Sequence, residues 1–252
     1  MQLKGERVLL TGGAGGLGAL VAERIALAGG DLTIVDRAPS SSGRARHIQG
    51  DLSTLEGVRA VLDVVAAEPW DVLINLAGVQ YFGPFEQQTP ESVVLTHMVN
   101  LVAPTLLAQA VAPGMRARKR GRIVNIGSIF GSINFAHFVT YSSSKAGLRG
   151  MTQALRRELA GSGLTVTYIA PRAVKTPLNT PQVLEFARRT NMHMDEPKKI
   201  AKRIVRAIVN CERDVYLGFP ESFFVRLNAV APSIVDGALA ANDKRAAELF
   251  AI

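Results

Sequence analysis

The chain of 252 residues contains 48% hydrophobic and 20% charged residues, with 23 glycines and 12 prolines. This composition excludes a disordered protein, a collagen-like repeat and a coiled coil. The net charge of +8 raises nucleic acid, an anionic lipid surface or an acidic substrate as partners. Cys211 is the single cysteine, so an internal disulfide is excluded and a reduced, cytoplasmic setting is predicted.

Short apolar runs alternate with longer amphipathic ones along the whole chain. This alternation predicts one α/β domain, 1–252, built on a doubly wound parallel sheet of about seven strands with helices on both faces. No uninterrupted apolar run reaches the roughly 18 to 20 residues of a membrane-spanning helix, so no transmembrane segment is expected. Strands are predicted at 8–10, 31–35, 47–50, 72–74, 123–126, 164–169 and 215–217, and helices at 17–28, 55–66, 91–111, 141–160 and 197–210.

A glycine-rich loop follows the first predicted strand and opens the first predicted helix. Glycines at this position let the backbone approach a pyrophosphate, and the N-terminus of the following helix attracts negative charge. A tight turn without a ligand and the loop of a methyltransferase are the alternative interpretations. The predicted cofactor-binding residues of this segment are Thr11, Gly12, Ala14, Gly16, Leu17 and Gly18.

Asp36 ends the second predicted strand, where a carboxylate can accept hydrogen bonds from an adenosine ribose. A carboxylate at this place repels a 2′-phosphate, and the glycine loop carries no Lys or Arg to hold one. NAD is therefore favoured over NADP as the cofactor. Arg37 is the reservation, because its guanidinium could reach a phosphate.

Tyr141 and Lys145 are four residues apart on a predicted helix and therefore share one face. A lysine ammonium near a phenol lowers its pKa, which makes Tyr141 a usable general acid or base near neutral pH. Ser128 follows the predicted strand at 123–126, so it lies at the carboxyl edge of the sheet, where ligands bind in such folds. A solvated helix face is the alternative for the Tyr–Lys pair alone.

Together these motifs resemble the classical short-chain dehydrogenases/reductases, which have a Rossmann-like fold. The resemblance runs from about residue 4 to residue 217. It implies that Tyr141 exchanges a proton with the substrate oxygen, Ser128 binds that oxygen, and Lys145 holds the nicotinamide ribose. It also implies that Asn100 anchors a water of a proton relay. Tyr141 and Lys145 therefore also count as cofactor-binding residues, together with Asp51, Leu52, Asn75, Ala77, Gly78, Pro171, Val174 and Thr176.

The chain departs from the family pattern at several positions. Leu76 replaces a second asparagine, and Arg172 replaces a glycine after Pro171. Arg172 is expected to bind an acidic substrate group or the cofactor pyrophosphate, or else to point to solvent. Asp51 has the additional interpretation of a helix cap. The segment between Asp36 and Asp51 is short, so the helix usually found there is expected to be a loop.

The resemblance implies a substrate lid region at 177–210, and an unusual helical extension is predicted at 219–252. The pattern of the extension predicts one amphipathic helix, or two broken at Pro232, that cover the pocket, form a subunit contact or lie on a membrane. The first two are favoured because its polar residues form no basic face. His137 and Phe138 are further candidates for the pocket wall.

These observations predict an NAD(P)(H)-dependent oxidoreductase that interconverts a carbonyl and a secondary alcohol. An apolar ketone and an acyl thioester are the candidate substrates, and no metal site is predicted. A dinucleotide-sensing protein on the same fold is the alternative. Nucleic acid is not expected as a partner, because the basic cluster at 116–122 precedes a strand and lies at the opposite edge of the sheet, where it is expected to form a solvated turn. A homodimer or homotetramer is expected from the resemblance alone.

Overall fold

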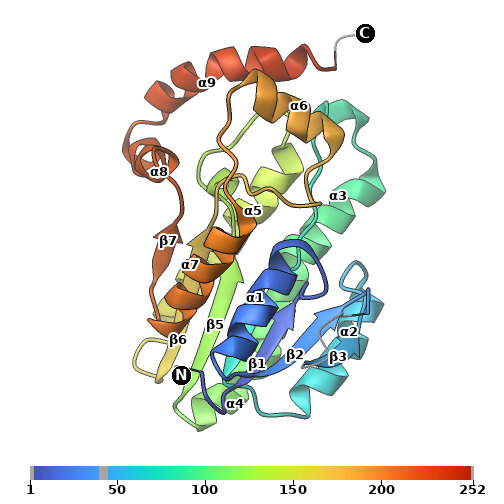
Figure 1. The fold of residues 1–252 in the computed structure, drawn as a ribbon, viewed down its shortest axis with the longest axis vertical. Helices are drawn as coiled ribbons and strands as arrows, with labels where there is room; N and C mark the ends of the chain where they lie inside the picture. Colours follow the sequence, from blue (N-terminus) through green and yellow to red (C-terminus); the bar gives the residue numbers. More distant parts are fainter. Residues whose placement is uncertain (1–2, 40–44, 251–252) are drawn as a thin grey trace.

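The computed structural model describes residues 3–39 and 45–250, which fold around a seven-stranded sheet (Figure 1). Every strand pairs in parallel with its neighbours, in the order β3-β2-β1-β4-β5-β6-β7. The predicted doubly wound parallel sheet is confirmed. The strands are β1 (Arg7–Thr11), β2 (Asp31–Asp36), β3 (Arg46–Gln49), β4 (Val72–Asn75), β5 (Gly121–Ile126), β6 (Leu164–Ala170) and β7 (Asp214–Tyr216).

Helices cover both faces of the sheet because its central strands are apolar on both sides. On one face, α1 (Gly16–Leu27) and α7 (Pro197–Val209) pack with residues such as Leu10 and Ile74 in one core. On the other face, α2 (Leu55–Ala66), α4 (Ala103–Ala117) and α5 (Val139–Glu158) pack with Leu9, Leu73 and Ile123 in a second core.

The helix predicted at 91–111 is longer than the pattern indicated and contains an irregular turn. It begins with α3 (Pro90–His97), continues through a π-helical segment, η2 (Met98–Val102), and ends with α4. By length and composition alone, Pro90–Ala117 could cross a membrane. Polar residues interrupt this segment, so it contains no uninterrupted apolar run of the length that was expected for a membrane-spanning helix. Its α4 part packs its buried side chains into the core beside α2, as the core helix of a globular domain does.

The connections leaving β1 and β4 run to opposite faces of the sheet. A crevice therefore opens between these strands at their carboxyl ends, where ligands bind in doubly wound folds. The segments that cover this edge are η1 (Phe85–Gln87), η3 (Ile129–Gly131), α6 (Pro181–Arg189), α8 (Glu221–Val230) and α9 (Pro232–Ala247). Figure 1 shows α6 and α9 together beyond the carboxyl ends of the strands.

The C-terminal extension forms two helices, α8 and α9, that meet immediately before Pro232, as the sequence indicated. Val225 and Val235 pack against Ile129 and Ile133, in the segment that follows β5. Ala246 packs in a separate aromatic cluster near α6. The extension therefore covers the carboxyl edge of this same chain.

The basic cluster before β5 lies at the amino edge of the sheet, opposite the crevice. Three of its members are engaged there with other groups of the protein. Arg118 donates to the carbonyl of Trp70 at 2.6 Å, Arg120 pairs with Asp71 at 3.1 Å, and Arg122 pairs with Glu6. Arg122 is half-buried, so the expectation of a purely solvated turn is wrong for this residue.

Candidate active site

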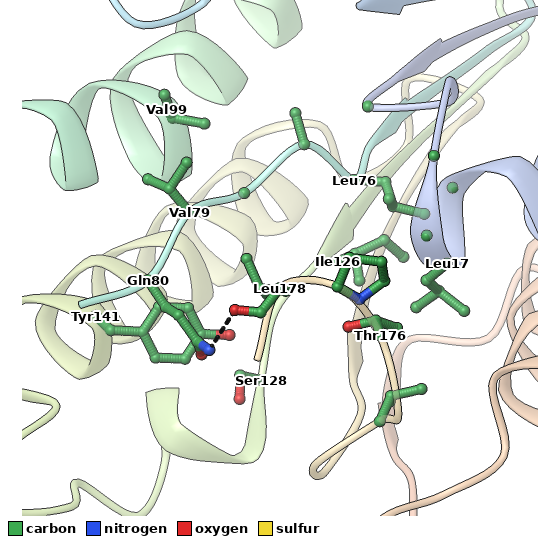
Figure 2. A pocket seen from close by; sticks show the side chains of 18 of the residues that line it. Leu17, Leu76, Val79, Gln80, Val99, Ile126, Ser128, Tyr141, Thr176 and Leu178 are labelled. Carbon is green, nitrogen blue, oxygen red and sulfur yellow. Dashed lines mark hydrogen bonds between the residues drawn. The ribbon is translucent and has the colours of Figure 1, made fainter. Parts of the chain in front are cut away.

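A cavity of about 670 Å³ opens at the carboxyl edge of the sheet. The loops after β1, β2, β4, β5 and β6 line it, together with α6 and the segment that precedes α6. Figure 2 shows part of this wall, with the side chains of Tyr141 and Ser128 facing the same space.

The glycine loop is packed too closely to carry side chains. Gly12 has a φ of +72°, and a Cβ on it would lie 2.7 Å from the Cα of Ala77. A Cβ on Gly18 would lie 1.9 Å from the carbonyl oxygen of Gly12. The loop therefore exposes its backbone and the N-terminus of α1 to the cavity. Such a surface suits an anionic pyrophosphate. The residues of this segment on the wall are Gly12, Ala14, Gly15, Gly16, Leu17 and Gly18.

Asp36 lies on the cavity wall at the end of β2, with Arg37 beside it. Its carboxylate accepts hydrogen bonds from the backbone N–H groups of Ala14, at 3.0 Å, and Ala38, at 3.1 Å. These bonds tie the carboxylate to the glycine loop and fix its position. The carboxylate is therefore held on the cavity wall beside the glycine loop.

Asp51 and Leu52 also line the cavity. Hydrogen bonds from the side chain and backbone of Ser53 lower the pKa of Asp51. The cap of α2 is Thr54, whose hydroxyl accepts from the N–H of Gly57 at 3.0 Å, so the interpretation of Asp51 as that cap is wrong. Arg46 already belongs to β3, and residues 40–44 of the expected loop lie outside the described residues.

Two predicted cofactor contacts, Thr11 and Asn75, do not lie on the cavity wall. The Thr11 hydroxyl accepts from the N–H groups of Leu76 and Ala77, both at 3.1 Å. Asn75 is buried below the wall and donates to Asn125 Oδ1 at 2.8 Å. Both side chains are thus engaged with protein groups, and that of Thr11 positions the loop after β4. Leu76 packs against the core beneath α1.

Ala77 and Gly78 do line the cavity, and Asn100 stands directly behind them. Asn100 Oδ1 accepts from the N–H of Val79 at 2.9 Å, and Nδ2 donates to the Val79 carbonyl at 2.8 Å. Nδ2 also donates to Ser144 Oγ at 3.0 Å. Asn100 therefore fastens the loop after β4 to α5, one residue from Lys145.

Tyr141 and Lys145 project from α5, and both are almost fully buried. Ser128 caps η3, where its hydroxyl accepts from the N–H of Phe130 at 3.1 Å. Lys145 Nζ donates to the carbonyl of Ile126 at 3.1 Å and lies 5.9 Å from the centre of the Tyr141 ring. The three side chains predicted to carry the chemistry thus meet on one wall of the cavity.

Burial sets the protonation of this group. It raises the pKa of Tyr141, an effect that a hydrogen bond with Ser128 partly offsets. It lowers the pKa of Lys145 to about 8. The expectation that Lys145 lowers the pKa of the phenol is wrong for the protein without cofactor, because desolvation of the phenolate is the larger effect.

Pro171, Val174 and Thr176 line the cavity after β6, as predicted, but Arg172 does not fit any of its predicted roles. Its Nε and Nη2 each donate to Asp195 at 2.9 Å. Its Nη1 donates to Glu221 at 2.8 Å and to the carbonyl of Phe219 at 3.0 Å. The guanidinium therefore ties the C-terminal extension to the lid instead of binding an acidic ligand or pointing to solvent.

The structure adds one contact that sequence reasoning missed. Gln80 Nε2 donates to the carbonyl of Leu178 at 2.8 Å, which joins the loop after β4 to the lid beside Tyr141 (Figure 2). Phe130, Phe186 and Met192 also line the cavity. Phe138 lines it as expected, but His137 does not, because its ring packs against Phe82 and Phe250. No local sequence pattern marks the Gln80 contact.

Comparison with known proteins decides the family. The family model described as short chain dehydrogenase matches residues 6–185. The chain belongs to the short-chain dehydrogenase family. Ketoacyl reductase HetN of Nostoc sp. is 31% identical, over 97% of this chain and 93% of its own length. D-xylose 1-dehydrogenase of Caulobacter vibrioides is 35% identical, over 69% of this chain and 74% of its own length.

Solved structures of the family are similar over almost the whole chain. A short-chain dehydrogenase from Sphingobium yanoikuyae, solved with NADPH, superposes with a TM-score of 0.77 at 28% identity. The match covers 92% of this chain and 95% of that one. The protein is thus an oxidoreductase that transfers hydride with a nicotinamide dinucleotide. The side-chain-free glycine loop and the anchored Asp36 carboxylate fit that cofactor.

Proposed function

We propose that the protein interconverts a ketone and a secondary alcohol, with Tyr141 as the residue that exchanges the proton. The observation that carries this proposal is the meeting of Tyr141, Ser128 and Lys145 on one cavity wall beside the glycine loop. The nicotinamide, when bound, supplies or accepts the hydride. Loss of turnover in the Tyr141→Phe variant is the result that tests the proposal.

In the reductive direction, the carbonyl oxygen needs a proton as the carbon receives hydride. The raised pKa of Tyr141 keeps its phenol protonated near neutral pH, so that it can donate. Ser128 orients the oxygen by a hydrogen bond. Lys145, whose Nζ lies 5.9 Å from the centre of the Tyr141 ring, would hold a cofactor hydroxyl and stabilise the phenolate that is left.

A dinucleotide-sensing protein on the same fold is the second candidate function. It requires the glycine loop and Asp36 but has no use for an acid, an orienting hydroxyl and a buried lysine on one wall. The placement of these three groups on one wall therefore favours an enzymatic function over a sensing function.

NADH is the expected cofactor, at least about tenfold better than NADPH in kcat/KM. The reason is that two like charges about 4 Å apart repel by about 4 kcal/mol at an effective dielectric of 20. The Asp36 carboxylate would stand this close to a 2′-phosphate. The Asp36→Ala variant should lose most of the preference, measured as the ratio of kcat/KM for the two cofactors.

The control for this comparison is Asp31→Ala, at the exposed amino end of the same strand, which should leave the ratio unchanged. Arg37 lines the cavity beside Asp36, and three similar structures were solved with NADPH or NADP. A preference for NADPH in the unmodified protein would show that Arg37 dominates the recognition.

The rate of cofactor capture should depend on the ionisation of Lys145. The amine is protonated below its pKa of about 8 and neutral above it. At saturating ketone, kcat/KM for NADH reports groups of the free enzyme. It should be constant at lower pH and fall as pH rises through about 8. The Lys145→Arg variant stays charged at these pH values, so its kcat/KM should not fall as the pH rises through this range. A wild-type profile that is flat between pH 7 and about 10 would contradict the assignment to Lys145.

A cytoplasmic location and a homodimer or homotetramer belong to the same proposal. The single cysteine and the family resemblance support them, and light scattering of the purified protein tests the assembly. Nucleic acid is not proposed as a partner. The contacts of Arg118, Arg120 and Arg122 with protein groups support this.

A further inference from the structure

The cavity has two chemically different ends. The end at the glycine loop carries Asp36, Arg37 and Asp51. The other end, beyond Tyr141, is apolar. Its wall is formed by Phe130, Phe138, Leu178, Val183, Phe186 and Met192.

Aromatic rings dominate this apolar end and are contributed by separate segments. Phe130 and Phe138 come from the segment between β5 and α5, and Phe186 comes from α6. The centres of the Phe130 and Tyr141 rings are 6.0 Å apart, and those of Phe138 and Phe186 are 6.1 Å apart. Ala246 of α9 packs in the same cluster. The wall is thus built from three parts of the fold, immediately beside the proton donor.

Charge at this end is neutralised within the protein. Apart from Lys145 beside Tyr141, Arg172 is the charged side chain there among the wall residues that the structure describes, and Asp195 and Glu221 occupy its guanidinium. Its side chain is 12% exposed. On the lid helix, Arg188 and Arg189 both pair with Glu185. Neither Arg188 nor Arg189 lies on the cavity wall, so a carboxylate or phosphate entering here would find the Arg172 guanidinium already paired with two carboxylates.

The polar amides at this end are also committed. Gln80 donates to the Leu178 carbonyl at 2.8 Å. Asn179 donates to the carbonyls of Val174, at 2.7 Å, and Thr176, at 3.2 Å. The hydroxyls of Ser128 and Tyr141 remain for the substrate, and they serve its reacting oxygen. A polyhydroxylated substrate would bury groups without partners, which is costly.

We propose that the substrate is an uncharged ketone, or the matching secondary alcohol, with an aromatic or similarly bulky apolar group on the carbonyl carbon. The apolar group packs against the wall that Phe130, Phe138 and Phe186 form, while the oxygen meets Tyr141 and Ser128. Carboxylates, sugars and thioesters on an acidic carrier are excluded by the same wall. This inference rests on the proposed function, since it concerns the same site.

A matched pair of ketones tests the inference: methyl 4-acetylbenzoate and 4-acetylbenzoate. They differ by a charge at the end of the ring remote from the ketone. The neutral ester should have a kcat/KM at least about 100-fold higher, because a buried carboxylate without a free cation is strongly disfavoured. Calorimetric titration of each compound into the unmodified protein with bound NAD⁺, which cannot supply a hydride to a ketone, should give the same order of affinity.

The results separate the two levels of the proposal. Tighter binding of the ester without any turnover would overturn the proposed function and support the inferred pocket. Equal or better binding of the acid, more efficient turnover of D-xylose, or no binding of the ester at millimolar concentration would overturn the inference.

A variant on the lid locates the effect. Phe186→Ala should lower kcat/KM for the ester by about 10- to 200-fold, the range for lost apolar contacts in a specificity pocket. Leu184→Ala lies on the exposed side of the same helix, where Leu184 is 48% exposed, and should leave kcat/KM unchanged. Equal effects of the two changes would show that the lid as a whole, and not the aromatic wall, was altered. That result would overturn the assignment of Phe186.

Discussion

Replacing Tyr141 by phenylalanine is expected to lower kcat about 10²- to 10⁴-fold, the range that a positioned general acid contributes. The change removes one hydroxyl from a side chain that is already buried against Phe130 and Phe138, so the packing of α5 is retained. NADH affinity should change by no more than about twofold, because the glycine loop and Asp36 are untouched. The measurements are the consumption of NADH with a saturating ketone and a fluorescence titration of NADH.

Tyr81→Phe is the matched control. The Tyr81 hydroxyl donates to the carbonyl of Pro84 at 3.1 Å, and Tyr81 does not lie on the cavity wall. This variant should keep full turnover. If Tyr141→Phe also turned over at the wild-type rate, Tyr141 would not be the proton donor. If Tyr141→Phe lost both NADH binding and turnover, the result would instead indicate damage to the fold.

The parts of the site that the sequence predicted depend on local patterns. A glycine loop between a strand and a helix, an acid at the next strand end and a Tyr–Lys pair four residues apart each describe a short segment. In a parallel sheet the carboxyl ends of all strands meet at one edge. The topology therefore brings Gly12, Asp36, Ser128 and Tyr141 to one cavity without any long-range information beyond the alternation of strands and helices.

The contacts that the sequence did not predict concern what a side chain meets across the fold. Thr11 and Asn75 occupy the expected strand ends but point to backbone groups and to Asn125. Arg172 is bound by Asp195 and by Glu221, which lies 49 positions away in the chain. Such contacts depend on how distant segments pack, which hydrophobic periodicity does not encode.

The direction of the Tyr141 pKa shift failed for a related reason. The Tyr–Lys spacing correctly predicted that the two side chains share a helix face. It contained no information on how deeply that face is buried. Burial favours the uncharged forms of both residues, so it raises the pKa of Tyr141 and lowers that of Lys145.

Truncation of the chain after Pro220 is expected to lower the melting temperature by about 10 °C or more and to reduce solubility. The deletion removes Val225 and Val235 from their contacts with Ile129 and Ile133. Each buried valine contributes about 1.5 to 3 kcal/mol. For a domain of this size, each kcal/mol corresponds to about 2 to 4 °C. The deletion also removes Glu221 from Arg172 and exposes the aromatic cluster behind the lid.

Two neighbouring residues of α9 provide a sharper form of this test. Val235 is 3% exposed and Ile234 is 60% exposed. Val235→Ala should lower the melting temperature, whereas Ile234→Ala should leave it nearly unchanged, as measured by calorimetry. If the truncated protein melted and turned over like the full chain, the tail would not support the fold. The aromatic wall beside Tyr141 would then have to be held by α5 and the lid alone, without the contact of Ala246.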